Sequence, residues 1–342
     1  MDAPTHLKKT EEQTISSCEE ARRLEDFYII ENRTIGRGHY AIVNAGKCRQ
    51  TGRSVAIKKI RRFLSDEKRV RSEITVLQSI EKHPNIVELI DVLETPREVY
   101  LVLEMCSGGE LFERLADKGP YSEADCARHT RDMAKAVQYL HENGILHRDL
   151  KPENILLSST DDRTASLKVA DFGLAKILKG KSTKTKCGTW GYSAPEMISG
   201  SGCTFGYDYK VDSWSLGTIL YILLCGYHPF DSTGATSDNE IIANIKACRY
   251  NFDDEAWTAI SADAKDLIGH LLELNPDDRY STTQILSHPW IHSAHSDPKS
   301  MLPLSPRIHH DLAKYQKSSK HKNSFSILDD EYDYKAIEKD DL

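Results

Sequence analysis

The sequence predicts an α+β fold with two lobes: a small, mainly antiparallel β lobe with one key helix, followed by a larger, mainly α-helical lobe. Three observations support this prediction. Between Phe27 and Leu103, short runs rich in β-branched residues alternate with turns, and one stretch has helical spacing of its apolar residues. After Gly108-Gly109 the apolar periodicity is helical as far as Ile291. The chain has 342 residues, which is enough for about two domains.

The smaller lobe is predicted at about 26–105 and the larger lobe at about 106–291, which together form one domain at 26–291. Residues 1–25 are polar and charged, which favours a flexible N-terminal segment over a functional arm. The first lobe is expected to contain strands at 28–30, 41–43, 55–57, 86–93 and 99–103, and a helix at 66–82.

In the second lobe, Ser122-Glu123-Ala124-Asp125 has the pattern of a helix capping box. The apolar stretch from Leu216 to Cys225 is too short to span a bilayer, so it predicts a buried helix and no membrane span. The composition changes after Ile291, and residues 292–342 are interpreted as a C-terminal tail with a candidate regulatory role.

Composition excludes several classes of function. The net charge of −7 argues against a nucleic-acid-binding protein, which usually has a basic excess. The eight cysteines contain no Cys-x-x-Cys pair, so a disulfide framework or zinc site is not expected. A reducing compartment, the cytoplasm or the nucleus or both, is the predicted location.

Three motifs occur in a fixed order: His147-Arg148-Asp149-Leu150-Lys151-Pro152-Glu153-Asn154, then Asp171-Phe172-Gly173, then Ala194-Pro195-Glu196. In this order they resemble the catalytic loop, metal-binding loop and activation-segment end of the eukaryotic protein kinase family. The resemblance implies the bilobal protein kinase fold. It also implies transfer of the γ-phosphate of ATP, with Mg²⁺, to hydroxyl groups of protein substrates.

The resemblance gives each motif residue an expected role. Asp149 is the candidate base that accepts the substrate hydroxyl proton, and Lys151 is expected to neutralise the transferring phosphoryl group. Asn154 and Asp171 supply the oxygen ligands expected to hold Mg²⁺.

Lys58 ends the strand pattern Val55-Ala56-Ile57-Lys58, where the family has a phosphate-pairing lysine. Among Glu67, Glu73 and Glu81, Glu73 is its best partner because Ile74 and Leu77 place it beside the buried face of the helix. A glycine turn precedes this strand, although Ala41 stands where the family has a third glycine. The residues expected to bind ATP are Ile35, Gly36, Arg37, Gly38, His39, Tyr40, Ala41, Ile42, Val43, Ala56, Lys58, Glu73, Glu104, Cys106 and Leu156.

Five residues are expected to have structural roles: Arg148, Thr189, Glu196, Asp212 and Arg279. The resemblance pairs Glu196 with Arg279. Asp212 is expected to brace the catalytic loop through backbone amides, and Thr189 to hydrogen-bond near Asp149.

Lys151 after Asp149 resembles serine/threonine kinases, and several segments, including Gly108-Gly109-Glu110-Leu111-Phe112, resemble the calcium/calmodulin-dependent protein kinase group. Glu110 and Glu153 resemble residues that bind an arginine upstream of the phosphorylated residue, because carboxylates favour guanidinium. Protein substrates with upstream basic residues are therefore expected.

Two regulatory features are predicted. Thr185 occupies the family's usual activation-loop phosphosite, where a phosphate could pair with Arg148, and an upstream activating kinase is then a candidate partner. The alternative is a loop that is active without phosphate. In the tail, Ile308, Leu312 and Tyr315 fall on one face of a basic helical pattern, which suits a calmodulin target, an autoinhibitory segment or a solvated tail.

Two competing functions remain at this stage. A pseudokinase would use the same fold as a scaffold, but Lys58, Asp149, Asn154 and Asp171 are all present, which favours catalysis. A kinase of small molecules would share the fold, but the Ala194-Pro195-Glu196 segment and the long activation loop favour protein substrates.

Overall fold

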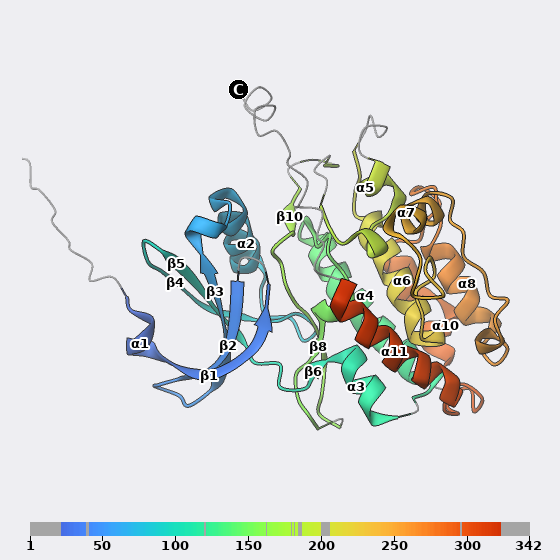
Figure 1. Ribbon diagram of the computed structural model, residues 1–342, viewed down its shortest axis with the longest axis horizontal. Helices are drawn as coiled ribbons and strands as arrows, with labels where there is room; N and C mark the ends of the chain where they lie inside the picture. The colour runs from blue at the N-terminus through green and yellow to red at the C-terminus, as the bar shows by residue number, and fades with distance from the viewer. Residues whose placement is uncertain are drawn as a thin grey trace, which may run out of the picture.

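The structure is a computed structural model that describes residues 22–38, 41–119, 121–161, 163–178, 180, 182–183, 187–199, 206–294 and 296–322. It has two lobes (Figure 1), a strand-rich lobe followed by a helical lobe, as the sequence predicts. Within the described residues, no helix is both long and apolar enough to cross a membrane.

The first lobe is a five-stranded sheet in the order β1-β2-β3-β5-β4, and every neighbouring pair of strands is antiparallel. Helix α2 is its main helix. The elements are α1 (Leu24–Phe27), β1 (Tyr28–Arg37), β2 (Ala41–Cys48), β3 (Ser54–Arg61), η1 (Arg62–Leu64), α2 (Glu67–Ser79), β4 (Leu89–Glu94) and β5 (Glu98–Glu104). The prediction of a small antiparallel lobe with one key helix is confirmed.

The N-terminal edge of this lobe includes Leu24, which is buried on the sheet against a small cluster containing Tyr28, Val55 and Tyr100. Packing therefore begins two residues before the lobe start at residue 26 expected from the sequence. Residues 1–21 of the predicted flexible segment lie outside the described residues.

One predicted strand is shorter than expected. The sequence predicts a strand over 86–93, but β4 begins at Leu89. The preceding residues bind the second lobe instead, since Val87 N–H donates to the Val169 carbonyl and Val169 N–H donates to the Asn85 carbonyl. This segment therefore links the two lobes and does not lengthen the sheet.

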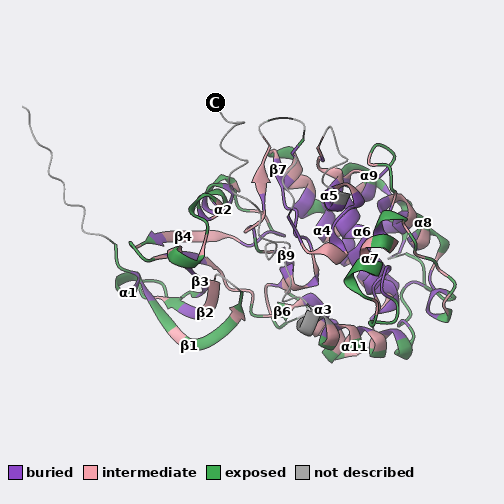
Figure 2. Cartoon of the chain, turned by 45° about the horizontal axis from the view of Figure 1, so that its top comes forward, coloured by how far each residue is buried: buried purple, intermediate pink, exposed green. Residues whose placement is uncertain are grey.

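The second lobe is built around α4 and α6, with short strands along its boundary with the first lobe. Helix α6, which contains the predicted buried stretch from Leu216 to Cys225, has buried residues on every face (Figure 2). The predicted capping box at Ser122 and Asp125 begins α4. The elements are β6 (Gly109–Glu110), α3 (Leu111–Lys118), α4 (Glu123–Glu142), β7 (Ile145–Leu146), η2 (Pro152–Asn154), β8 (Ile155–Leu157), β9 (Leu167–Val169), β10 (Lys176–Ile177), η3 (Trp190–Tyr192), α5 (Pro195–Ser199), α6 (Lys210–Cys225), α7 (Asp238–Lys246), η4 (Glu255–Trp257), α8 (Ala262–Leu271), α9 (Thr282–Ser287), α10 (Pro289–Ser293) and α11 (Pro306–Lys322).

The tail helix α11 packs on this lobe against α3 and α6 (Figures 1 and 2). Its apolar residues Ile308 and Leu312 are buried, as the one-sided pattern in the sequence suggests. Gly226 ends α6 with a left-handed φ of 88°, and a side chain there would lie 2.5 Å from the Ile308 carbonyl oxygen and 2.9 Å from Leu312 N. A glycine is required because the two backbones approach so closely.

Candidate active site

The catalytic loop, residues 147–154, follows β7 and includes η2. Its first residues are hydrogen-bonded to a side chain of α6. Asp212, on the first turn of α6, is completely buried and accepts hydrogen bonds from the backbone N–H groups of His147 (3.0 Å) and Arg148 (2.9 Å). Its carboxylate also contacts His141 Nε2 at 2.8 Å. Arg148 has a left-handed φ of 67°, a conformation that costs energy for a non-glycine residue and so needs this bracing.

Asp149 lies at the centre of a group of three polar side chains. One of its carboxylate oxygens accepts a hydrogen bond from Thr189 Oγ1 (2.8 Å), and the other contacts Lys151 Nζ (2.8 Å). Lys151 also donates to Thr189 Oγ1 at 3.0 Å. Burial disfavours the charged lysine, but the Asp149 carboxylate outweighs this effect and raises the pKa of Lys151. The lysine is therefore a fixed cation next to a fixed carboxylate.

A second charged group joins three elements. Lys58 Nζ on β3 lies 2.7 Å from Glu73 Oε1 on α2 and 2.9 Å from Asp171 Oδ1, which follows β9. Glu67, a rival partner in the sequence, pairs instead with Arg62 and Arg71. The Lys58 charge lowers the pKa of Asp171 against the effect of burial. Burial opposes the charge of Lys58, yet Asp171 and Glu73 raise its pKa, so Lys58 and Asp171 are ionised at neutral pH.

Asn154 and Asp171 are a donor set that fits Mg²⁺. The Asn154 amide nitrogen donates to the Asp149 carbonyl at 2.7 Å, which leaves its oxygen as the atom for a cation. Mg²⁺ is usually held by one or two protein oxygens, with water and phosphate completing its octahedron. The described residues contain no cluster of three or more His, Cys, Asp or Glu side chains suited to a metal, so a protein-only metal cage is not found there.

The glycine turn is the hairpin between β1 and β2. Gly38 N–H donates to the Ala41 carbonyl at 2.9 Å, and Gly36 and Arg37 pair with Val43 and Ile42. His39 and Tyr40, two of the residues predicted to bind ATP, lie outside the described residues. The flanking residue Ile35 is on β1 and is 39% exposed, so its side chain is available to a ligand.

The remaining nucleotide-side residues come from both lobes. Ala56 on β3 pairs with Leu103 on β5. Glu104 is the last residue of β5, and Cys106 follows it in the connection between the lobes. Leu156 on β8 is half-buried. Burial and the Glu104 carboxylate raise the pKa of the Cys106 thiol to about 12, so it is protonated and unreactive at neutral pH.

Lys168 is a residue that sequence reasoning missed. It is buried on β9, and its Nζ lies 2.8 Å from Glu104 Oε2 and donates to the Ile86 carbonyl at 3.3 Å. This ion pair joins the end of β5 to β9, the strand that leads to Asp171. Lys168 stands between the apolar residues Leu167 and Val169. In a strand, this alternation predicts a lysine that faces solvent, so its burial could not be foreseen.

The activation segment is anchored at two points. Arg148 donates to the Leu174 carbonyl (2.7 Å) and to the Tyr207 hydroxyl (3.2 Å). At the other end, Glu196 and Arg279 form the ion pair that the resemblance implied, with N–O distances of 2.6 and 3.1 Å. Thr185, the predicted phosphosite, lies outside the described residues.

The two predicted substrate-binding carboxylates lie on neighbouring elements. Glu110 ends β6 and Glu153 is in η2, and these elements pack against each other beside the catalytic loop. Each side chain has one carboxylate oxygen buried from solvent. The structure therefore brings the two acidic residues onto elements that contact each other.

Comparison with known proteins identifies the family. A family model described as the protein kinase domain matches residues 29–291. The chain is 43% identical to a probable myosin light chain kinase of Dictyostelium discoideum, over 80% of this chain and 69% of that protein. It is 47% identical to human calcium/calmodulin-dependent protein kinase type IV, over 78% of this chain but only 55% of that enzyme. It is also 43% identical to myosin light chain kinase A of Dictyostelium discoideum, over 77% of this chain and 88% of that protein. This chain therefore belongs to the protein kinase family, among the serine/threonine kinases of the calcium/calmodulin-dependent group.

Proposed function

We propose that this chain transfers the γ-phosphate of ATP to serine and threonine hydroxyls of protein substrates and requires Mg²⁺. The observation that carries the proposal is the pair of polar side-chain groups described above. Lys58, Glu73 and Asp171 form one group, and Asp149, Lys151 and Thr189 form the other. Phosphoryl transfer needs this combination because its catalysis is mainly positioning and neutralisation of charge.

Each side chain has a distinct task in this proposal. Asp149 accepts the proton of the attacking hydroxyl, and its contacts with Thr189 and Lys151 fix the direction of its carboxylate. Lys151 neutralises the phosphoryl group as it moves, and Lys58 orients the phosphates. Asp171 and Asn154 would hold Mg²⁺, which supplies positive charge to the phosphate oxygens.

The substitution Asp149→Asn tests the assignment of the base. We expect kcat for a peptide substrate to fall by about a hundredfold or more, since a positioned base contributes that much, while ATP affinity stays near the wild-type value. Asp161→Asn is the matched control, because Asp161 lies on an exposed turn of the same lobe. Unchanged kcat in the Asp149 variant would contradict the assignment. A wild-type chain that binds Mg-ATP without transferring phosphate would favour the scaffold alternative.

The proposed substrates carry arginine or lysine upstream of the phosphorylated residue. Glu110 and Glu153 support this preference because they place two carboxylates beside the catalytic loop, where a guanidinium would bind with charge-assisted hydrogen bonds. A peptide library tests the preference directly. Equal rates for peptides with and without upstream basic residues would contradict it.

Regulation by phosphate on Thr185 is part of the proposal, with an upstream kinase as the partner that adds it. Arg148 supports it, since its guanidinium already donates to the Leu174 carbonyl in the activation segment and is a cation that could pair with a phosphate. The variant Thr185→Ala should then resist activation. Full activity of that variant would favour the alternative, a loop that needs no phosphate.

Calmodulin is a second proposed partner, through α11. The type IV relatives carry calmodulin dependence in their names, and α11 is a helix with basic residues and an apolar face. That face is already buried on the second lobe, and the Tyr315 hydroxyl contacts the Tyr192 hydroxyl next to the activation-segment end. Calmodulin would therefore have to remove α11 from the kinase domain. A gel-shift experiment with calcium-loaded calmodulin tests this step, and no shift at micromolar concentrations would contradict it.

A further inference from the structure

Arg69 connects α2 to the metal loop, and no role was expected for it. Its Nε donates a hydrogen bond to the Gly173 carbonyl at 2.9 Å. Arg69 stands four residues before Glu73, so the two side chains leave the same face of α2 one turn apart. One face of this helix therefore binds both the β3 lysine, through Glu73, and the end of the Asp171-Phe172-Gly173 loop, through Arg69.

The loop that Arg69 binds has a strained backbone. Asp171 has a left-handed φ of 59°, which is uncommon for a residue with a side chain and persists only where the surroundings impose it. Within the loop, Gly173 N–H donates to Asp171 Oδ1 at 3.3 Å. The hydrogen bond from Arg69 to the Gly173 carbonyl connects this loop to α2 in the first lobe.

Charges also meet at this point. A Cβ atom built on Gly173 would lie 3.3 Å from Asp171 Oδ1, 3.6 Å from Glu73 Oε2 and 3.7 Å from Arg69 Nη2. Because Gly173 has no side chain, the two carboxylates and the guanidinium can all approach this position. The Arg69 charge offsets repulsion between those carboxylates, as Lys58 does from the other side.

We propose that Arg69 is a positioning residue that holds the Asp171-Phe172-Gly173 loop in its metal-binding conformation, through its hydrogen bond to the Gly173 carbonyl. It acts through the loop and does not touch the reacting atoms. The consequence for catalysis rests on the proposed kinase function, but the effect on the loop does not.

The experiment compares Arg69→Ala, Arg69→Lys and the control Lys68→Ala in the full-length chain. Lys68 is the neighbouring residue on α2, carries the same charge and is exposed. Hydrogen exchange in the metal-free, nucleotide-free protein is the first readout. We expect amides in a peptide covering 171–178 to exchange about tenfold faster in Arg69→Ala, since a hydrogen bond to a charged group is lost. We expect Lys68→Ala to match the wild type, and Arg69→Lys to be intermediate because its ammonium can still donate.

The second readout separates positioning from a general loss of stability. In Arg69→Ala the Mg²⁺ concentration for half-maximal activity should rise about tenfold, with an unchanged KM for the peptide and a melting temperature equal to that of Lys68→Ala. Wild-type exchange in 171–178 in the Arg69→Ala variant would overturn the proposal. An equal loss in every kinetic constant together with a lower melting temperature would also overturn it. If Arg69→Ala does not fold, Arg69→Lys gives the same two readouts. An inactive wild-type chain would refute the proposed function alone, because the exchange measurement needs no activity.

Discussion

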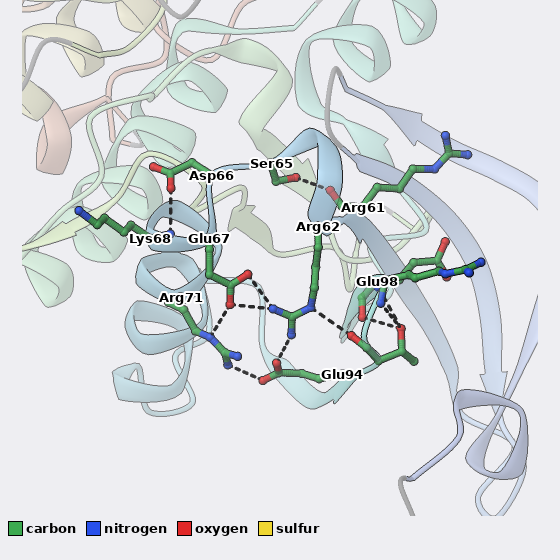
Figure 3. A network of polar contacts seen from close by, with 11 residues as sticks. Arg61, Arg62, Ser65, Asp66, Glu67, Lys68, Arg71, Glu94 and Glu98 are labelled. Atoms are coloured by element: carbon green, nitrogen blue, oxygen red, sulfur yellow. Dashed lines mark hydrogen bonds and ion pairs between the residues drawn. The ribbon is translucent and has the colours of Figure 1, made fainter. Parts of the chain in front are cut away.

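A network of exposed ion pairs in the first lobe contrasts with a buried ion pair in the second lobe. In the first lobe, Arg62 and Arg71 bind Glu67 and Glu94 in a network on the surface (Figure 3), which we call the β4–α2 clasp. These four side chains are 20–53% exposed. In the second lobe, the Arg279 side chain is fully buried, and Glu196 is 9% exposed.

The number of other contacts also differs. Arg279 donates to the carbonyls of Glu273 and Lys210 in addition to Glu196, and its guanidinium lies 5.1 Å from the centre of the Trp214 ring. The clasp has one main-chain acceptor, the Thr95 carbonyl, 3.1 Å from Arg62 Nε. Buried charges must stay paired, whereas exposed pairs can open into water at little cost.

This difference indicates which half of the active site can move. Asp149 and Asn154 lie on the second lobe, whose loop is fixed by the buried Asp212. Lys58 and Glu73 lie on the first lobe, where their own ion pair and the exposed clasp tie α2 to the sheet, and Arg69 ties α2 to the metal loop (Figure 3). Control of activity is therefore expected to act by shifting α2, while Asp149 stays in place.

The largest effect is expected from Glu196→Gln, which removes one charge from the buried pair. Because Arg279 would then be a buried cation without its carboxylate, we expect the second lobe to lose about 3–5 kcal/mol of unfolding free energy. Urea unfolding followed by tryptophan fluorescence measures this lobe alone, since all four tryptophans, Trp190, Trp214, Trp257 and Trp290, lie within it. Glu142→Gln on the exposed side of α4 is the control. A loss below about 1 kcal/mol would remove the contrast between the lobes.

A somewhat smaller effect is expected from pH, again in the second lobe. Burial, followed by the charge of Arg128, lowers the pKa of His129 on α4 to about 4. The unfolded chain binds a proton at this histidine below about pH 6.5, whereas the folded chain stays neutral until about pH 4. The contribution of neutral His129 to the unfolding free energy is therefore fully present above pH 6.5. About 3 kcal/mol of unfolding free energy is lost through this residue as the pH drops to 4.

Tryptophan-detected urea unfolding at pH 7, 5.5 and 4 checks this prediction. The variant His129→Gln should show a flatter dependence on pH than the wild type. His292→Gln, which changes an exposed histidine, should keep the wild-type slope. Equal slopes in the wild type and His129→Gln would show that His129 is not a source of acid sensitivity in this lobe.

The same contrast explains what the sequence could predict. The short motifs around Asp149 and Asp171 identify the residues of the site. The structure brings Lys151 to Asp149, its neighbour in the chain, and Lys58 to Asp171, which belongs to another family motif. Glu73 could be chosen over Glu67 because helical spacing shows which carboxylate borders the buried face. The strand-rich and helical lobes followed from their different apolar periodicities, whereas the bilobal kinase arrangement followed from the family motifs.

Long-range contacts of residues outside the family motifs could not be predicted. Arg69 is one of several arginines and lysines on α2, and its spacing from Glu73 does not reveal that its acceptor is a carbonyl 104 residues away. Lys168 on β9 pairs with Glu104 at the end of β5, 64 residues earlier, and nothing in either local sequence indicates this contact. Residues 86–88 have strand composition, but the carbonyl and N–H of Val169 compete successfully for their hydrogen bonds.

The smallest effect is expected from Glu94→Gln in the β4–α2 clasp. Glu94 accepts from both arginines, with Arg71 Nη1 at 2.6 Å, so its neutralisation weakens the link between β4 and α2 without burying any charge. Hydrogen exchange of amides in the first turns of α2 should rise by less than about fivefold at low salt, because exposed pairs contribute little. At about 1 M salt the difference should disappear, since the Debye length is then about 3 Å. Glu31→Gln, which removes an exposed pair with Lys47 elsewhere in the sheet, should leave α2 unaffected. A rise much larger than fivefold that persists in high salt would mean that the clasp behaves like the buried pair, and α2 would then be as fixed as the catalytic loop.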